Sequence, residues 1–301
     1  MKVTIAGVEF DNPLLTASGC CGYGEELAQF YPLSKLGGLV TKSITLEPRL
    51  GHPPPRTAET ASGMLNAIGL ANVGIDAFIR DKLPFLAKQK TRIIVNVAGA
   101  TIDEYVEVSR RLDDIAALDM IELNISCPNV DQGGIQFGSD PKLTEKVVAA
   151  VRAVFARPLI VKLSPNVTSI ADIASAAETG GADAFTVMNS VIGTAVDIDT
   201  RRPRLTNNKG GLTGPAIKPI ALAMVDAVHN RSRLPIIGVG GISDWRDAVE
   251  FFLCGATAVQ IGTALFVEPE APLKIVRDLK DYLRENKLKS INDLIGRLEK
   301  Y

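Results

Sequence analysis

The sequence reads MIELNIS at residues 120–126, LIVKLS at 159–164 and AFTVMNS at 184–190, three short runs that are mostly apolar. Continuous hydrophobicity, rather than strict alternation, is typical of parallel strands that are covered on both faces. Helix-like segments separate the runs, so this part of the chain predicts strands that alternate with helices.

The same pattern extends in both directions along the chain. Five further runs are LLTAS (14–18), GLVTK (38–42), RIIVNVA (92–98), PIIGVG (235–240) and AVQIGT (258–263). Eight strands alternating with helices predict an α/β protein of the (β/α)8 TIM-barrel class. The structural alternative is an open, doubly wound sheet, but SGCCGYG follows the first strand in place of GxGxxG. We expect a single barrel domain over residues 1–301.

Two connections are longer than a simple crossover needs. They are residues 43–91, which are rich in Pro and Gly and contain a helix pattern around 74–88, and residues 191–218. Both follow strands, so we expect structured loop insertions at the C-terminal face of the barrel, serving as lids or substrate walls. The tail after residue 270 predicts two amphipathic helices on the outside.

Composition excludes several functional classes. The 301 residues carry 33 Lys and Arg against 34 Asp and Glu, a formal net charge of −1. A balance so close to neutral gives no electrostatic support for binding nucleic acid or a membrane surface. The N-terminus resembles a pair of strands rather than a signal peptide, and no apolar run reaches the roughly 20 residues of a membrane helix. Four scattered cysteines form no disulfide framework, so we expect a cytoplasmic protein.

Polar residues gather where the predicted strands end. In a barrel these ends meet at the active-site face. The positions are Ser18, Lys42, Asn96, Asn124, Lys162, Asn189, Ser190, Gly240, Gly241, Gly262 and Thr263. Buried polar groups need partners, so their convergence predicts a polar ligand. Taken singly, each lysine is as compatible with a structural ion pair as with a functional role. Cys127 in NISCPN, taken singly, fits a packed small side chain better than a catalytic thiol.

Glycines after the last two strands predict a phosphate site. GVGGI (238–242) and IGT (261–263) let backbone N–H groups approach a phosphate. FMN and sugar phosphates both fit such a site, and tight turns are the purely structural explanation.

Metal and serine-triad chemistry have little support. The chain has only two histidines, His52 and His229, without HxH or HExxH spacing, and no GxSxG is present. We expect no metal site.

In this order, ASGCCGYG, TKSIT, NAIGLANVG, NISCPNV, VKLSPNV, NNKGGLTGPAIKP, GVGGI and QIGTAL resemble the class 1 dihydroorotate dehydrogenases. The similarity runs from about Asn12 to Phe266, and the class 1B catalytic subunit is the most similar type. The resemblance implies a barrel with one FMN per chain that oxidises (S)-dihydroorotate to orotate in pyrimidine biosynthesis. Cys127 would take the proton from C5 of the substrate, while hydride leaves C6 for flavin N5.

The resemblance also implies roles for other residues. Substrate contacts would come from Lys42, Asn66, Ala67, Ile68, Gly69, Leu70, Asn124, Asn189 and Ser190. FMN contacts would come from Ser18, Lys42, Ser43, Asn96, Asn124, Lys162, Met188, Gly214, Gly240, Gly241, Gly262 and Thr263. The chemistry agrees, because amides offer donors and acceptors to a small planar anion, and a lysine at the flavin N1/O2 edge stabilises negative charge.

The subclass determines the electron acceptor. Class 2 members carry serine at the base position, whereas this chain has Cys127. Class 1A homodimers reduce fumarate, while class 1B subunits pair with a partner that carries FAD and a 2Fe–2S cluster and reduces NAD. NAIGL and QGGIQFG favour class 1B, which implies a heterotetramer of two catalytic and two electron-transfer subunits. No role is assigned to Cys20 and Cys21.

Three other functions remain open at this point. The pyrimidine-reducing domain of dihydropyrimidine dehydrogenase shares a similar NISCPN loop and would act on uracil. A non-enzymatic metabolite-binding barrel would lack FMN. A sugar-phosphate isomerase or aldolase would need a catalytic carboxylate or Schiff-base lysine in place of the thiol.

Overall fold

Eight short strands, all parallel to their neighbours, close into a barrel. Around the barrel they run β10 (Ala184–Val187), β15 (Ile236–Val239), β16 (Ala258–Ile261), β3 (Leu14–Thr16), β4 (Gly38–Val40), β7 (Arg92–Val97), β8 (Met120–Asn124) and β9 (Leu159–Lys162). The computed structural model describes residues 1–126 and 137–301. Closure confirms the predicted TIM-barrel class and excludes the open sheet.

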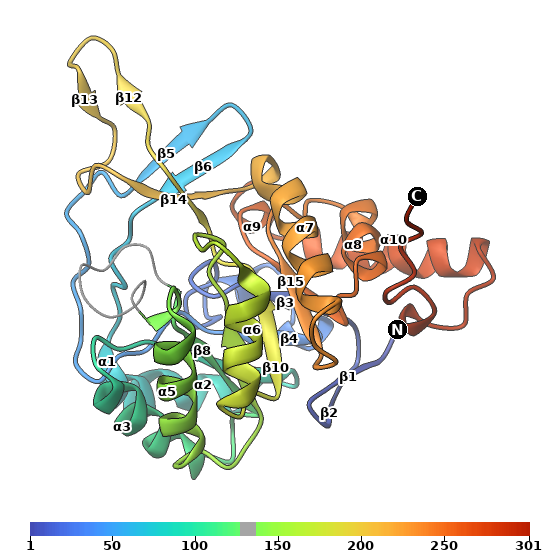
Figure 1. Cartoon of the computed structure of the whole chain (residues 1–301), viewed down its shortest axis with the longest axis horizontal. Helices are drawn as coiled ribbons and strands as arrows, with labels where there is room; N and C mark the ends of the chain where they lie inside the picture. Colours follow the sequence, from blue (N-terminus) through green and yellow to red (C-terminus); the bar gives the residue numbers. More distant parts are fainter. Residues whose placement is uncertain (127–136) are drawn as a thin grey trace.

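Helices cover the outside of the barrel (Figure 1). They are α3 (Ile102–Asp113), α5 (Pro141–Arg152), α6 (Ile170–Thr179), α7 (Lys218–His229), α8 (Trp245–Leu253) and α10 (Ala271–Glu285). Every residue of β8, β9, β10, β15 and β16 is buried, as continuous apolar runs predict. Among the described residues, no helix is both long and apolar enough to cross a bilayer.

Helix ends follow the local sequence signals. The Thr101 hydroxyl accepts the Glu104 N–H at 3.2 Å, and the Asp140 carboxylate accepts the Leu143 N–H at 2.9 Å. Each is an N-cap that satisfies one of the free amides of the first turn. The Glu104 carboxylate reaches back to the N–H of Ala100 at 2.7 Å rather than to that of Thr101.

The two long insertions fold together into a second sheet. It has the order β11 (Val191–Gly193), β14 (Gly210–Thr213), β6 (Gly63–Asn66) and β5 (Thr57–Thr60), with antiparallel neighbours. A small hairpin of β12 (Val196–Asp197) and β13 (Arg202–Pro203) projects away from it (Figure 1). The helix expected around 74–88 is present as α1 (Gly74–Ala77), η3 (Phe78–Lys82) and α2 (Leu83–Leu86). The insertions are therefore structured walls.

The ends of the chain agree only in part with expectation. The N-terminal strand pair is present as β1 (Val3–Ile5) and β2 (Val8–Phe10). The prediction of a second tail helix was wrong, because only the short turn η5 (Ile291–Asp293) forms. Gly296 adopts a left-handed φ of 68°, and the N–H groups of Gly296 and Leu298 donate to carbonyls at the end of α8. Beyond the turn η5, these bonds tie the tail backbone to the end of α8, where a second helix would have needed bonds along the tail itself.

Four further short elements occur in the described ranges. They are the turns η1 (Leu27–Gln29), η2 (Leu33–Lys35) and η4 (Pro215–Ile217) and the helix α9 (Ala264–Val267).

Candidate active site

A cavity of about 630 Å³ opens at the C-terminal ends of the barrel strands. Its wall contains most of the predicted site residues: Ser18, Lys42, Ser43, Asn66, Ile68, Gly69, Leu70, Asn124, Lys162, Met188, Asn189, Ser190, Gly214, Gly240, Gly241, Gly262 and Thr263. Asn96 and Ala67 are buried and are not part of this wall. Cys127 lies outside the described residues. The fold therefore brings together residues from nearly the whole length of the chain.

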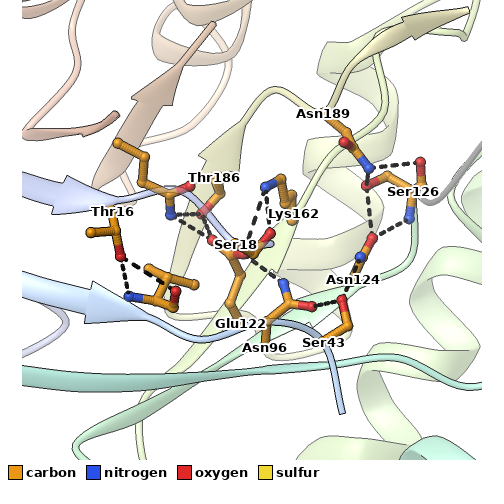
Figure 2. A network of polar contacts seen from close by, with 12 residues as sticks. Thr16, Ser18, Ser43, Asn96, Glu122, Asn124, Ser126, Lys162, Thr186 and Asn189 are labelled. Carbon is orange, nitrogen blue, oxygen red and sulfur yellow. Dashed lines mark hydrogen bonds and ion pairs between the residues drawn. The ribbon is translucent and has the colours of Figure 1, made fainter. Parts of the chain in front are cut away.

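Beneath the cavity lies a buried carboxylate that the sequence reasoning missed. Glu122 in β8 has no exposed surface. One of its oxygens accepts from Asn96 Nδ2 at 2.7 Å, and the other accepts from Thr186 Oγ1 and Gln260 Nε2, each at 2.6 Å (Figure 2). The Lys162 ammonium is 3.8 Å from the carboxylate and donates to Ser18 Oγ at 3.0 Å. A glutamate inside the apolar run MIELNIS was the available signal, since buried charges are rare unless paired.

A second set of hydrogen bonds continues from this carboxylate towards the cavity. Ser43 Oγ donates to Asn96 Oδ1 at 2.5 Å, and Asn124 Nδ2 lies 3.4 Å from Ser43 Oγ. Asn124 Oδ1 accepts from Ser126, and Asn189 Nδ2 donates to the carbonyl and the hydroxyl of Ser126, both at 3.0 Å. Figure 2 shows these side chains following one another from strand to strand. Hydrogen bonds within the protein thus already fix the orientation of each amide.

The second sheet forms the opposite wall. The Asn66 amide at the end of β6 donates to the carbonyl of Gly211 in β14 at 3.1 Å. A Cβ at Gly211 would lie 2.0 Å from Ser190 Oγ, so only glycine lets β14 pass this close to the serine. Asn166 Nδ2 donates to the Ser190 carbonyl at 3.0 Å. Pairing between the two insertions therefore fixes Asn66 and Ser190 against the same cavity.

Lys42 presents a positive charge to this end of the cavity. Burial lowers the pKa of its ammonium, the nearby guanidinium of Arg56 lowers it further, and Glu26 acts in the opposite direction. In the described part of the chain its ammonium has no hydrogen-bond or ion-pair partner. A half-buried cation of this kind is available to an anionic ligand.

Glycines form the other end of the cavity. A Cβ at Gly240 would lie 2.9 Å from Ala221, and one at Gly241 would lie 2.9 Å from the Gly214 carbonyl, so these two glycines are required by packing. Gly262 differs, because a Cβ there would meet only Ala17 and Cys20 at 3.4 and 3.5 Å, ordinary contact distances. Its missing side chain leaves room on the cavity side. This is the arrangement that lets a phosphate approach backbone N–H groups.

Two further observations limit the chemistry. Cys20 lines the cavity, but burial raises the pKa of its thiol to about 11, with Lys162 opposing the shift. A neutral thiol is a poor nucleophile and base. Within residues 1–126 and 137–301, no group of three or more His, Cys, Asp or Glu side chains is placed to hold a metal ion.

Comparisons with known proteins agree on one family. The family model described as dihydroorotate dehydrogenase matches residues 1–283. A protein of Geobacter sp. (strain M21) named dihydroorotate dehydrogenase B (NAD(+)), catalytic subunit, is 52% identical over 99% of this chain and 98% of its own length. A protein of the same name from Trichlorobacter lovleyi is 54% identical over the same shares.

A solved structure has the same fold. The structure described as DHODH in complex with ferulenol from Eimeria tenella superposes with a TM-score of 0.83 and 23% identity, over 98% of this chain and 88% of that one. At that identity, the likeness supports the barrel fold alone.

Proposed function

Because the chain belongs to the dihydroorotate dehydrogenase family, we propose that it is the catalytic subunit of an NAD-linked enzyme that oxidises (S)-dihydroorotate to orotate in pyrimidine biosynthesis. The observation that carries the proposal is a single cavity with two chemically different ends. One end has fixed amides and a lysine that has no hydrogen-bond or ion-pair partner among residues 1–126 and 137–301, and the other has glycines that leave space for a phosphate.

The residues present fit FMN. The space beside Gly262 and the backbone of Gly240, Gly241 and Thr263 suit its phosphate. Lys162, held by Glu122 and Ser18, supplies the cation that a flavin ring needs when it becomes negatively charged. When bound, FMN supplies the two-electron acceptor for the hydride that leaves the substrate.

The amide end suits the substrate. Dihydroorotate is a small anion with a carboxylate and with amide edges that both donate and accept. Asn66, Asn124 and Asn189 offer both kinds of group, and Lys42 offers a positive charge for the carboxylate. The bonds between Asn124, Ser126 and Asn189 fix the amides, so little rotational freedom remains to be lost on binding.

We assign removal of the C5 proton to Cys127. The support is its place in the motif NISCPN, directly after Ser126, whose carbonyl and hydroxyl are both bound by Asn189. Ser126, the residue before it in the sequence, is therefore bonded to a side chain of the proposed substrate end. A thiol works as a base only when its pKa falls towards ambient pH or its proton can be relayed.

The relatives are named catalytic subunits, which indicates that a separate partner subunit exists. The finer proposal is a heterotetramer of two such chains with two electron-transfer subunits that carry FAD and a 2Fe–2S cluster and pass electrons to NAD. We also propose that residues 1–301 form one domain. The cytoplasm suits the chain, since Cys20, Cys21 and Cys254 are all free thiols.

The test is product identification in steady state. The FMN-loaded chain is given dihydroorotate and an artificial electron acceptor, and orotate formation is followed by chromatography. We expect orotate from dihydroorotate and no turnover of dihydrouracil. Turnover of dihydrouracil, without turnover of dihydroorotate, would instead assign the chain an activity of the dihydropyrimidine dehydrogenase type. A chain that binds no FMN would refute the proposal.

A further inference from the structure

We propose that Glu122 is a positioning residue that holds Lys162 at the cavity floor and offsets part of its charge, and thereby sets how strongly the site stabilises a reduced flavin. This inference rests on the proposed function. It concerns a carboxylate that lies below the cavity rather than in its wall.

Burying the charged Glu122 brings little net gain in stability, which points to a functional reason for its charge. Among the described residues, Glu122 and Lys162 are the only Asp, Glu, Lys or Arg side chains classed as buried. Taking two opposite charges out of water costs about as much as their attraction returns, and apolar replacements are often equally stable. One residue in register with Glu122 is the buried apolar Ile160 of β9, so an apolar side chain can occupy this level of the barrel. Stability alone therefore gives no reason for an ion pair here.

The contacts of Glu122 reach the cavity by two routes. Through the ion pair of 3.8 Å it faces Lys162, which lines the cavity. Through Asn96 it orients Ser43, which also lines the cavity. Thr186 and Gln260 hold the far oxygen at 2.6 Å each, so the carboxylate is fixed from both sides (Figure 2). Strands β7, β9, β10 and β16 all converge on this one group.

The charge of Glu122 reduces the positive potential that Lys162 presents to a ligand. An enzyme of this type must accept electrons from its substrate and then release them to a partner. An uncompensated lysine would favour the first step and hinder the second, because it would stabilise the reduced, negatively charged ring too strongly. Glu122 balances the two requirements.

The variant Glu122→Gln removes the charge with little change of shape. Its new NH2 group would face Thr186 and Gln260, where the wild-type carboxylate accepts hydrogen bonds. Gln260 Oε1 has no hydrogen-bond partner in the described structure, so rotation of the Gln260 amide provides the missing acceptor. Thr186→Val is the matched control, because it removes one hydrogen bond to Glu122 and leaves the charge in place.

The measurement is sulfite binding to the FMN-loaded protein, followed by bleaching of the flavin absorption. Sulfite adds reversibly to the oxidised ring and leaves a negative charge on it, so its Kd reports the positive potential there. An anion in contact with Lys162 lies within ~10 Å of Glu122, and at an effective dielectric constant of ~20 one unit charge changes its affinity by about tenfold or more. We expect the sulfite Kd of Glu122→Gln to fall at least about tenfold and its flavin midpoint potential to rise. Thr186→Val should stay within about twofold of the wild type.

Two results overturn the inference: a sulfite Kd for Glu122→Gln within about twofold of the wild type, or equal shifts in Glu122→Gln and Thr186→Val. If Glu122→Gln retains no FMN, Glu122→Asp decides. Retention of FMN by the aspartate variant shows that the charge is what matters, and its loss shows a role in packing alone. The proposed function is tested separately, because wild-type protein that dihydroorotate reduces upholds it whatever Glu122 does.

Discussion

Gly262 and Gly238 provide a contrast between a glycine kept for a ligand and a glycine kept for packing. A methyl group at Gly262 would meet Ala17 and Cys20 at 3.4 and 3.5 Å, so the protein has room for it. A methyl group at Gly238 would lie 2.4 Å from the ring of Phe251, which is fully buried. We therefore expect opposite consequences from the same substitution at Gly238, inside β15, and at Gly262, which directly follows the neighbouring strand β16.

Gly262→Ala should leave the free energy of unfolding of the apoprotein nearly unchanged, within about 0.5 kcal/mol, because its φ is outside the left-handed region and no contact is tight. Its FMN Kd should rise by roughly tenfold to a hundredfold, since losing one hydrogen bond to a charged group costs about 1.5–3 kcal/mol. Gly238→Ala should lower stability by about 1–3 kcal/mol through overpacking. Its FMN Kd, measured well below the unfolding transition, should change less than that of Gly262→Ala.

The assays are urea unfolding of the apoproteins and fluorescence titration with FMN. An FMN Kd for Gly262→Ala within about twofold of the wild type, at unchanged stability, would refute the assignment of this end of the cavity to the phosphate. A large loss of stability in Gly262→Ala would show that the space beside it is smaller than the contacts indicate.

Three further predictions concern single side chains. Because the pKa of Lys42 is lowered, its ammonium loses its charge at a lower pH than a free lysine does. Orotate should therefore bind most tightly at neutral pH, and its affinity should fall as pH rises, starting below the ordinary lysine range. The orotate Kd measured against pH for wild type and Lys42→Met checks this, and a wild-type Kd that does not change with pH contradicts it. Cys127→Ala should keep FMN but lose reduction by dihydroorotate, and an active variant would assign proton removal to another group. Tyr105→Phe removes a buried hydrogen bond of 2.8 Å to the Asn124 carbonyl, so the free energy of unfolding should fall by about 1–3 kcal/mol. An unchanged denaturant midpoint would count against this role of Tyr105.

Much of the barrel could be predicted because its signal is local. Runs such as LIVKLS and PIIGVG carry continuous hydrophobicity, and each becomes a strand with every core position buried. The ends of parallel barrel strands meet at one face, and this rule alone predicts that Lys42, Asn124 and Asn189 lie around one cavity, as they do.

The second sheet could not be predicted, because its signal is not local. Strand β6 reads GMLN and β14 reads GGLT, segments too short and too rich in glycine to indicate strands. Their pairing joins Asn66 to Gly211, residues 145 apart in the sequence. Only the folded barrel brings the two insertions to the same face.

Glu122 and the tail were missed for related reasons. In the sequence, Glu122 is one charge inside an apolar run, and its meaning depends on Asn96, Lys162, Thr186 and Gln260 from four other strands. The tail has a helical pattern of apolar residues, but contacts with α8 determine its backbone. In both cases the structure depends on tertiary contacts, and the pattern of a single segment carries no information about those contacts.

The central claim is that one cavity holds a flavin next to dihydroorotate. The most direct measurement is an anaerobic titration of the FMN-loaded chain with dihydroorotate, recorded as the loss of flavin absorption at about 450 nm. We expect the absorption to be lost in proportion to the substrate added and to end at one equivalent per flavin. Flavin that stays oxidised with excess dihydroorotate, in protein shown to be folded and fully loaded, would contradict the account.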